Sequence, residues 1–186
     1  MGCSHSPAAL VFCLLTLVGS GAGAVDMPDG YRLDHYRAAT PQTVPGGTVV
    51  TLPEAQAMVA DGKALILDVV GAGRFLTPGL EDEWLVAEPR HSLPGAVWLP
   101  NVGRGTLTPQ LERYYRENLQ RLTGGRKDNP ILIFCIADCW MAWNAVKRAA
   151  SYGYQAVYWY REGTDGWREA GLPLIAVTPE PLPPED

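Results

Sequence analysis

Two short apolar runs, ALILDVV (64–70) and PILIFC (130–135), constrain the fold of this chain more than any other feature. A strand with one face in water alternates apolar and polar residues, whereas continuous runs of this length are typical of strands buried on both faces. Parallel strands of this kind need helices between them and over both faces of the sheet. We therefore predict an α/β fold with an open, mostly parallel sheet and helices on both faces.

The remaining elements follow from shorter apolar segments and from residues that begin or end helices. Thr51 and Glu54 form a candidate capping box, Thr108-Pro109 is a typical helix start, and Gly153 stands where a helix would end. The other predicted strands are 48–52, 96–100 and 156–160, the predicted helices are 53–60, 109–122, 140–151 and 165–171, and residues 71–90 are predicted as a long loop.

The first 24 residues contain no Lys, Arg, Asp or Glu and include an apolar run from Ala8 to Val18. This run is too short to span a bilayer, and the small residues at 22–24 fit a signal-peptidase site. We predict a secretory signal that is cleaved after Ala24. The opening MGCSHS also matches a myristoylation pattern, but the apolar run behind it is better explained by export.

The chain is predicted to have four segments: a signal peptide (1–24), an extended N-terminal arm (25–47), one domain (48–176) and a Pro-rich tail without fixed structure (177–186). The formal net charge is −5 and no run of Lys or Arg stands out, which argues against a nucleic-acid partner. Because no second apolar span follows the leader, no membrane span is expected in the mature chain.

Removal of the leader takes away Cys3 and Cys13 and leaves Cys135 and Cys139. Exported chains meet oxidising conditions, in which such a pair spends time as a disulfide. A bridge across five residues constrains the unfolded chain less than a bridge between distant segments. The pair is therefore predicted to serve chemistry rather than architecture.

Cys135 is the last residue of the second long apolar run, at a strand end expected to be exposed, and a helix is expected to begin near Trp140. Ligands of parallel sheets collect at the carboxyl ends of the strands, and the amino end of a helix favours anions. A thiol in this place is favoured as the reactive thiolate. The charge of Asp138 acts in the opposite direction, unless that residue caps the helix.

A set of motifs resembles a single rhodanese domain over roughly residues 48–175. The motifs occur in the order of that family: LILDVV (65–70), HSLPGAVWLP (91–100), ILIFC (131–135), SYGYQAVYWY (151–160) and GWREAGLPL (166–174). The resemblance implies the rhodanese-like version of the predicted sheet, with Cys135 in the position of the sulfur-carrying nucleophile.

CIADCWMAWNAVKRA (135–149) with WYREGTDGW (159–167) is more narrowly similar to exported rhodanese-like proteins named for a cysteine-cysteine-tryptophan motif, here CxxxCW. These proteins are associated with pyrroloquinoline quinone-dependent alcohol catabolism. The resemblance implies a periplasmic location and a periplasmic protein partner, with a quinoprotein dehydrogenase system as the candidate.

The cysteine loop departs from ordinary rhodaneses at three positions. The family has a basic residue five positions beyond its cysteine, which binds the anionic sulfur donor, and this chain has Trp140 there. Asp138 replaces the usual loop glycine, and Cys139 is an additional thiol. Because the positive charge is missing, transfer of sulfur from thiosulfate is not expected.

Three hypotheses remain open for the loop. In the first, Cys135 attacks a thiol or disulfide partner and Cys139 resolves the mixed species. In the second, Cys135, Cys139 and Met141 bind a soft metal such as Cu(I), or a quinone stacks between Trp140 and Trp143. Zinc is less suited, because four ligands are needed and only His35 and His91 remain as histidines of the mature chain.

The third hypothesis is a noncatalytic interaction module. Trp140 and Trp143 are three residues apart and so share one helix face, which belongs either to the core or to a roof over the cysteine pocket. Other candidate pocket residues carry predicted roles. Asp68 is expected to organise the loop beside the site, and Asp165 to supply a carboxylate or to form a turn before Gly166. Asn144 is expected to cap or pack locally, and Trp167 to line the pocket. Lys147 and Arg148 are expected to lie on a solvated helix face.

Overall fold

The computed structural model describes residues 1–2, 25–75 and 83–184. The predicted leader and its cleavage site fall on residues 3–24, which lie outside this range. Among the described residues, no helix combines the length and the apolar composition that crossing a membrane requires.

A five-stranded sheet forms the centre of the domain, and all of its strand pairs are parallel. The predicted α/β fold with a parallel sheet is therefore confirmed. The buried runs at 64–70 and 130–135 supply two adjacent inner strands, as their continuous apolar character indicates. The strand order is β1 (Thr48–Val50), β8 (Val157–Tyr160), β7 (Ile131–Phe134), β2 (Leu65–Asp68) and β6 (Val97–Trp98).

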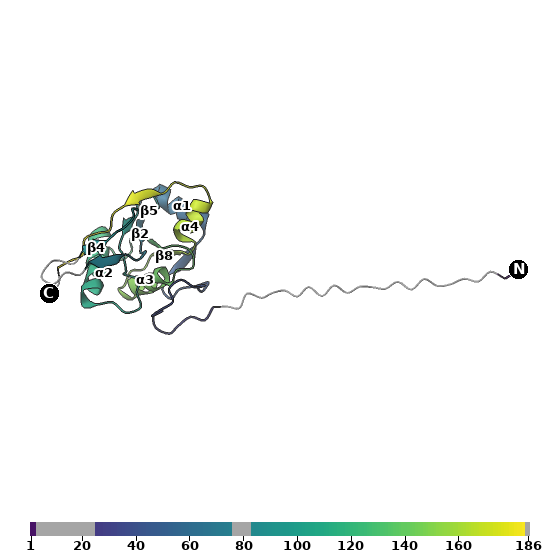
Figure 1. Cartoon of the computed structure of the whole chain (residues 1–186), viewed down its shortest axis with the longest axis horizontal. Coiled ribbons are helices and arrows are strands. Elements are labelled where there is room, and N and C mark those ends of the chain that lie inside the picture. Colours follow the sequence, from purple (N-terminus) through teal and green to yellow (C-terminus); the bar gives the residue numbers. More distant parts are fainter. Residues whose placement is uncertain (3–24, 76–82, 185–186) are drawn as a thin grey trace.

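Helices cover both faces of the sheet, as predicted (Figure 1). Helices α2 (Pro109–Leu122) and α3 (Trp140–Ser151) pack on one face, and α1 (Leu52–Asp61) and α4 (Gly163–Glu169) on the other. Side chains of the central strand β7 alternate between the two cores: Ile131 and Ile133 face α2 and α3, whereas Leu132 and Phe134 face α1 and α4. The same alternation directs Cys135 to the α3 face.

The helix starts agree with the capping residues in the sequence. The Thr51 N–H donates a hydrogen bond of 2.7 Å to the Glu54 carboxylate ahead of α1. The Thr108 hydroxyl accepts one of 3.3 Å from the Leu111 N–H ahead of α2. These contacts satisfy N–H groups that have no partner inside the helix.

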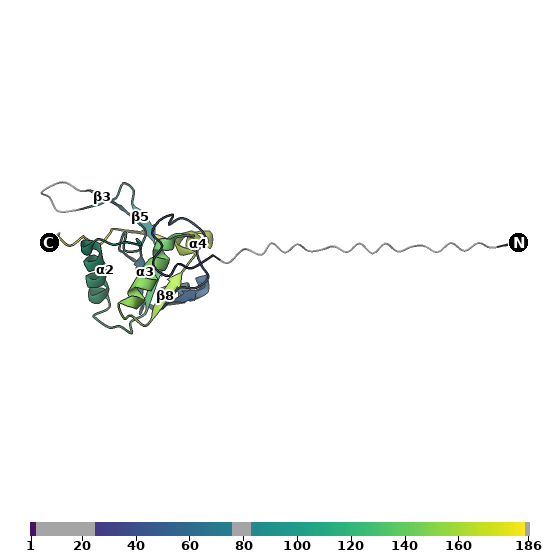
Figure 2. The same ribbon diagram turned by 90° about the horizontal axis from the view of Figure 1, so that it is seen from below.

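The segment predicted as one long loop contains short strands. β3 (Gly73–Phe75) and β4 (Glu83–Leu85) form an antiparallel pair, and β5 (Arg90–Ser92) pairs with β9 (Ile175–Val177). Figure 2 shows the β3–β4 pair extending away from the sheet. Strands of three residues are too short to display an alternating pattern, so the sequence contained no signal for them.

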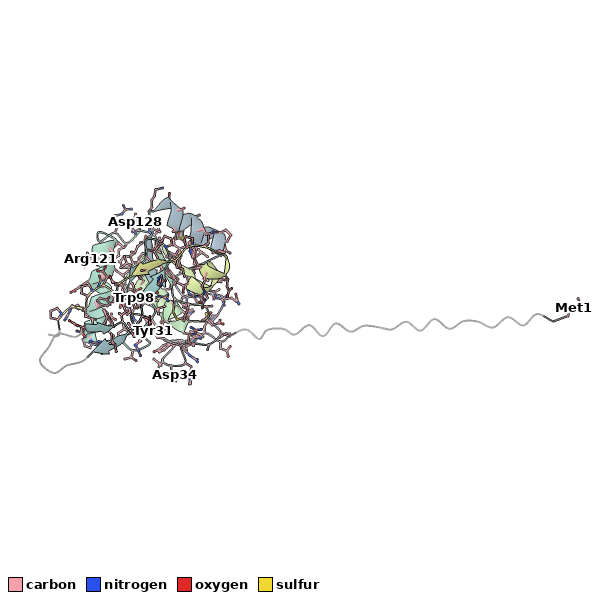
Figure 3. The ribbon with its side chains drawn as sticks, turned by 45° about the horizontal axis from the view of Figure 1, so that its top comes forward. Met1, Tyr31, Asp34, Trp98, Arg121 and Asp128 are labelled. Carbon is pink, nitrogen blue, oxygen red and sulfur yellow. A yellow bond between two sulfur atoms is a disulfide. The ribbon has the colours of Figure 1, made fainter. Side chains whose placement is uncertain are left out.

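The Pro-rich tail packs against the domain, which corrects the prediction that it has no fixed structure. The Glu180 carbonyl accepts hydrogen bonds of 2.8 Å from both the Trp84 indole and the Tyr114 hydroxyl. The Glu180 N–H donates to the carbonyl of Trp98, a residue labelled in Figure 3. Composition alone did not reveal this contact, because its partners lie far away in the sequence.

Candidate functional site

A disulfide joins Cys135 and Cys139 in the short loop between β7 and α3. Their Cα atoms are 6.2 Å apart, within the range that disulfides normally span. Cys135 directly follows the central strand, and Cys139 directly precedes the first residue of α3. The loop therefore places both sulfurs at the carboxyl edge of the sheet, beside the amino end of a helix.

The start of α4 fixes the backbone of the first half of this loop. The Thr164 N–H donates a 3.0 Å hydrogen bond to the Cys135 carbonyl, and Ile136 and Gly163 form an antiparallel bridge. Gly163 has a φ of 54°, and a Cβ added there would lie 2.4 Å from the Cys135 carbonyl oxygen. Only glycine permits both this backbone conformation and this close approach.

Asp165 brings a carboxylate to the middle of the loop. One of its oxygens accepts a 3.1 Å hydrogen bond from the Ala137 N–H, and the other accepts one of 2.7 Å from Arg168. A negative charge therefore lies beside the loop that carries the two sulfurs. Nearby negative charge disfavours a thiolate and so favours the disulfide over the reduced pair.

Asp138 does not cap α3. The residue at the cap position is Cys139, and no side chain donates or accepts a capping hydrogen bond there. Asp138 itself is exposed and has a φ of 51°, the left-handed conformation that aspartate tolerates better than most residues. Its role in the loop is therefore to make a tight turn.

Asp68 lies at the end of β2, in register with Phe134 beside the cysteine loop, and is fully buried. Its carboxylate accepts hydrogen bonds from the Val70 N–H at 3.0 Å and the Ser92 hydroxyl at 2.6 Å, and it pairs with Arg90 at 2.8 Å. Burial raises the pKa of the Asp68 carboxyl, while Arg90 and the hydrogen bonds act in the opposite direction. The cluster holds the loop after β2 against the sheet.

Trp140 and Trp143 belong to the core, with exposed fractions of 1% and 0%. Their rings meet edge to face, with centroids 5.3 Å apart and planes inclined by 65°. A quinone cannot stack between two rings that already touch in this way, so that cofactor hypothesis is wrong. Each indole N–H instead donates to a backbone carbonyl of the N-terminal segment, at Ala39 and Thr43.

The remaining candidate residues lie in three different surroundings. Met141 lies next to Gly71, where an added Cβ would be 3.2 Å from the Met141 methyl carbon. Asn144 is buried and binds Arg32 and Gly103 rather than capping locally. The structure does not bring Trp167 to the loop, because its ring packs in the core on the α1 face.

Arg148 corrects another prediction, since it is buried rather than solvated. Its guanidinium donates to the backbone carbonyls of Val102, Arg104 and Gly105, at 2.8, 2.9 and 3.0 Å. Lys147, on the same helix, is half-buried and reaches the backbone of the N-terminal segment.

The N-terminal segment covers the cysteine loop. We call residues 29–44 the strap; Figure 2 shows this dark segment beside α3, and Figure 3 labels two of its residues, Tyr31 and Asp34. The Trp140 N–H donates to the Tyr36 carbonyl at 2.9 Å, and the Ala38 N–H to the Asp138 carbonyl at 3.1 Å. Under this cover only 1% of Cys135 and 4% of Cys139 are exposed, so the expectation of an exposed strand end is wrong.

Metal ligands are not assembled around the loop. Within residues 25–75 and 83–184, no three His, Cys, Asp or Glu side chains are grouped so that they could hold an ion. In the soft-metal hypothesis the donors would be Cys135, Cys139 and Met141, but the two cysteine sulfurs are bonded to each other. A thiolate, rather than a disulfide, is the form that binds metal.

Fold and loop together define an α/β domain with a cysteine pair at the carboxyl end of its central strand. The family of the Rhodanese-like domain matches residues 51–170, and the chain belongs to this family. A comparison with curated proteins gives no match.

Several solved structures are similar to this chain at low sequence identity. The polysulfide-sulfur transferase homodimer from Wolinella succinogenes is 18% identical, with 70% of this chain and 79% of that chain covered and a TM-score of 0.43. The human single-domain sulfurtransferase TSTD1 is 21% identical, with 66% and 96% covered and a TM-score of 0.42. EanB is 18% identical, with 69% and 27% covered and a TM-score of 0.43.

Proposed function

We propose that this rhodanese-like domain acts in thiol–disulfide chemistry, with Cys135 and Cys139 cycling between a disulfide and two thiols. The disulfide inside the loop between β7 and α3 is the observation that carries this proposal. It closes only a five-residue loop within a strand–helix connection that α4 and the strap also hold in place. The fold therefore does not depend on the bridge, and the bridge can open without unfolding of the domain.

The exchange balances with a dithiol as the reductant. One partner thiolate attacks a sulfur of the pair, the Cys135–Cys139 bond breaks, and a mixed disulfide and a free thiolate form. The second partner thiolate then breaks the mixed disulfide. In total two electrons and two protons pass from the partner to the cysteine pair, and the partner leaves as a disulfide.

Charge around the loop supports exchange over sulfur transfer from an anionic donor. Trp140 occupies the position of the basic residue and is buried, and Asp138 and Asp165 add negative charge to the loop. The loop itself, residues 135–140, contains no Lys or Arg that could bind an anion such as thiosulfate. A sulfur relay from a neutral or protein-bound donor would use the same two cysteines in their reduced form.

The test is to titrate the full chain through dithiothreitol redox buffers and count the thiols alkylated by a maleimide, using mass spectrometry. We expect the thiols of Cys135 and Cys139, identified by peptide mapping, to appear together and reversibly. Either Cys135→Ser or Cys139→Ser is expected to abolish the transition. A pair that stays oxidised until the protein unfolds would overturn the proposal. Sulfur release from thiosulfate at rates typical of rhodaneses would replace it with sulfur transfer.

We also propose that the chain is exported to the periplasm without residues 1–24 and supports quinoprotein-dependent alcohol catabolism. The CxxxCW motif at 135–140 and the charge-free leader support this proposal. Deletion of the gene is expected to slow growth on alcohols and to leave growth on sugars unchanged. Recovery of the full-length chain in the cytoplasm, with both thiols reduced, would contradict it.

A further inference from the structure

The strap is held mainly by its backbone. Asn144 binds both main-chain groups of Arg32, accepting from its N–H at 2.9 Å and donating to its carbonyl at 2.8 Å. This amide mimics the pairing that a neighbouring β-strand would provide. Further strap carbonyls accept hydrogen bonds from the α3 region, namely those of Asp29 and Gly30 from Lys147, Tyr36 from the Trp140 N–H, Ala39 from the Trp140 indole and Thr43 from the Trp143 indole.

A surface that recognises backbone atoms accepts extended segments of many sequences. Such recognition resembles the addition of a strand to an exposed edge, where main-chain hydrogen bonds give affinity and side-chain pockets give selectivity. Two tyrosines of the strap make the side-chain contacts: Tyr31 packs on the Arg148 guanidinium at 4.1 Å, and the Tyr36 hydroxyl accepts from the Gly105 N–H at 2.9 Å. Leu33 is left 65% exposed.

Arg37 occupies the strap position opposite Cys139, in an antiparallel bridge. The hydrogen bonds that flank this bridge run from the Trp140 N–H to the Tyr36 carbonyl and from the Ala38 N–H to the Asp138 carbonyl. This arrangement is the non-hydrogen-bonded type of antiparallel pair, in which Cα atoms are about 4.5 Å apart. A cysteine at position 37 would therefore lie within the Cα range of a disulfide to Cys139.

We propose that the surface under the strap is a docking groove for an extended segment of a partner protein, and that a cysteine of that segment takes the place of Arg37. The chemistry of this step rests on the proposed thiol–disulfide function, whereas the groove rests on the strap contacts alone. In the described structure the chain's own N-terminal segment occupies the groove. The partner must therefore displace the strap before exchange begins.

The geometry assigns the two sulfurs different parts in the exchange. The partner thiolate attacks the Cys139 Sγ, a mixed disulfide forms between the partner and Cys139, and Cys135 leaves as the thiolate. The bridge between Arg37 and Cys139 places the partner sulfur opposite Cys139, so Cys135 is the sulfur that leaves. In the hypothesis from the sequence, Cys135 forms the mixed disulfide and Cys139 resolves it. The geometry reverses these two roles.

Arg37→Cys tests the position without an external ligand. We expect peptide mapping of the oxidised full chain to find a bridge between the introduced cysteine and Cys139, together with an alkylatable Cys135. Ala39→Cys is the matched control, since it adds a thiol on the same strap two residues from the bridged position, and its bridge to Cys139 is expected about tenfold less often. Retention of the Cys135–Cys139 bridge, with the introduced thiol free, would overturn the proposal.

A peptide that copies residues 29–44 with cysteine in place of Arg37 tests the groove from outside, with glutathione as the small-thiol probe. Ala38→Pro in the full chain removes one backbone hydrogen bond of the strap, and circular dichroism checks that the domain stays folded. The peptide is expected to react about fivefold faster with this variant than with wild type, whereas glutathione gains less. Equal gains for both probes would show that any thiol reaches the disulfide without a groove.

The two proposals fail in different experiments. For trapping, the peptide is supplied as its mixed disulfide with glutathione. The free Cys139 thiolate of Cys135→Ser is expected to displace glutathione and hold the peptide as a stable mixed disulfide, whereas Cys139→Ser is expected to show no such trapping at Cys135. Trapping on Cys135 instead would overturn the docking geometry while leaving the thiol–disulfide function intact. A wild-type pair that cannot be reduced reversibly would overturn the function, whatever the position of the bridge in Arg37→Cys.

Discussion

Asp165 shows how a single residue adjusts the chemistry of the cysteine pair. Its carboxylate accepts the Ala137 N–H within the loop and pairs with Arg168. A negative charge beside the loop disfavours a thiolate, so the oxidised state of the pair is favoured over the reduced state.

Asp165→Asn is expected to make the reduction potential of the pair less negative by roughly 10–30 mV, because it removes charge and retains an acceptor for the Ala137 N–H. Equilibration of the full chain with dithiothreitol buffers gives this potential. Asp128→Asn is the control, since Asp128 lies on the opposite side of the domain from the strap (Figure 3). Equal shifts in the two variants would mean that net charge, rather than contact with the loop, sets the potential.

Asp68 acts at the residue scale on stability. Asp68→Asn is expected to lower the free energy of unfolding by about 3 kcal/mol, because Arg90 would remain largely buried without its charged partner. Asp61→Asn removes an exposed ion pair with Lys63 and is expected to change it by less than about 1 kcal/mol. Urea denaturation measures both. If both variants lost a similar free energy of unfolding, burial of the ion pair would not be the reason for the loss.

At the scale of elements, the loop is shaped by the start of α4 on one side and by the strap on the other. The Thr164 N–H and the Asp165 carboxylate bind the loop from α4, while Tyr36 and Ala38 bind it from the strap. The loop between β7 and α3 is thus held at both ends by segments that are distant in the sequence.

Gly163→Ala tests the contact between α4 and the loop. The substitution combines a left-handed backbone with a Cβ only 2.4 Å from the Cys135 carbonyl, so a loss of at least about 2 kcal/mol is expected. Gly62→Ala is the control, because Gly62 has a φ of 67° and nothing within 4 Å of the added Cβ, so a loss of about 1 kcal/mol is expected. Equal losses would mean that backbone conformation alone matters at Gly163.

The sequence predicted those elements whose signals are local. Continuous apolar runs located β2 and β7, and capping residues such as Thr51 and Thr108 located the helix starts. Cys135 at a strand end followed from the length of its run. The strap contacts could not be predicted. Asn144 binds the backbone of Arg32, 112 residues away, and the sequence does not indicate which backbone groups a distant side chain will bind.

At the scale of the whole molecule, both terminal segments of the described domain pack over the helices of one face. The strap follows α3, and the tail crosses α2 and reaches β6 through the bridge between Trp98 and Pro179. Helix α3 is therefore buried over most of its length, whereas α2 keeps an exposed face at Arg116, Glu117 and Gln120. The strap covers the cysteine loop. Among the described residues, no hydrogen bond joins the tail to that loop.

This difference predicts that the tail contributes to stability and the strap to reactivity. A chain that ends at Thr178 lacks the Glu180 carbonyl, which accepts hydrogen bonds from Trp84 and Tyr114. We expect its free energy of unfolding to be about 2–4 kcal/mol lower than that of wild type. Burial raises the pKa of Tyr114, so alkaline absorbance titration should show one more tyrosine ionising near its ordinary value. A chain that ends at Pro184 is the control and should match wild type.

The chain that ends at Thr178 keeps the cysteine loop intact, so its reduction potential should equal that of wild type. A shifted potential would mean that tail and loop form one cooperative unit.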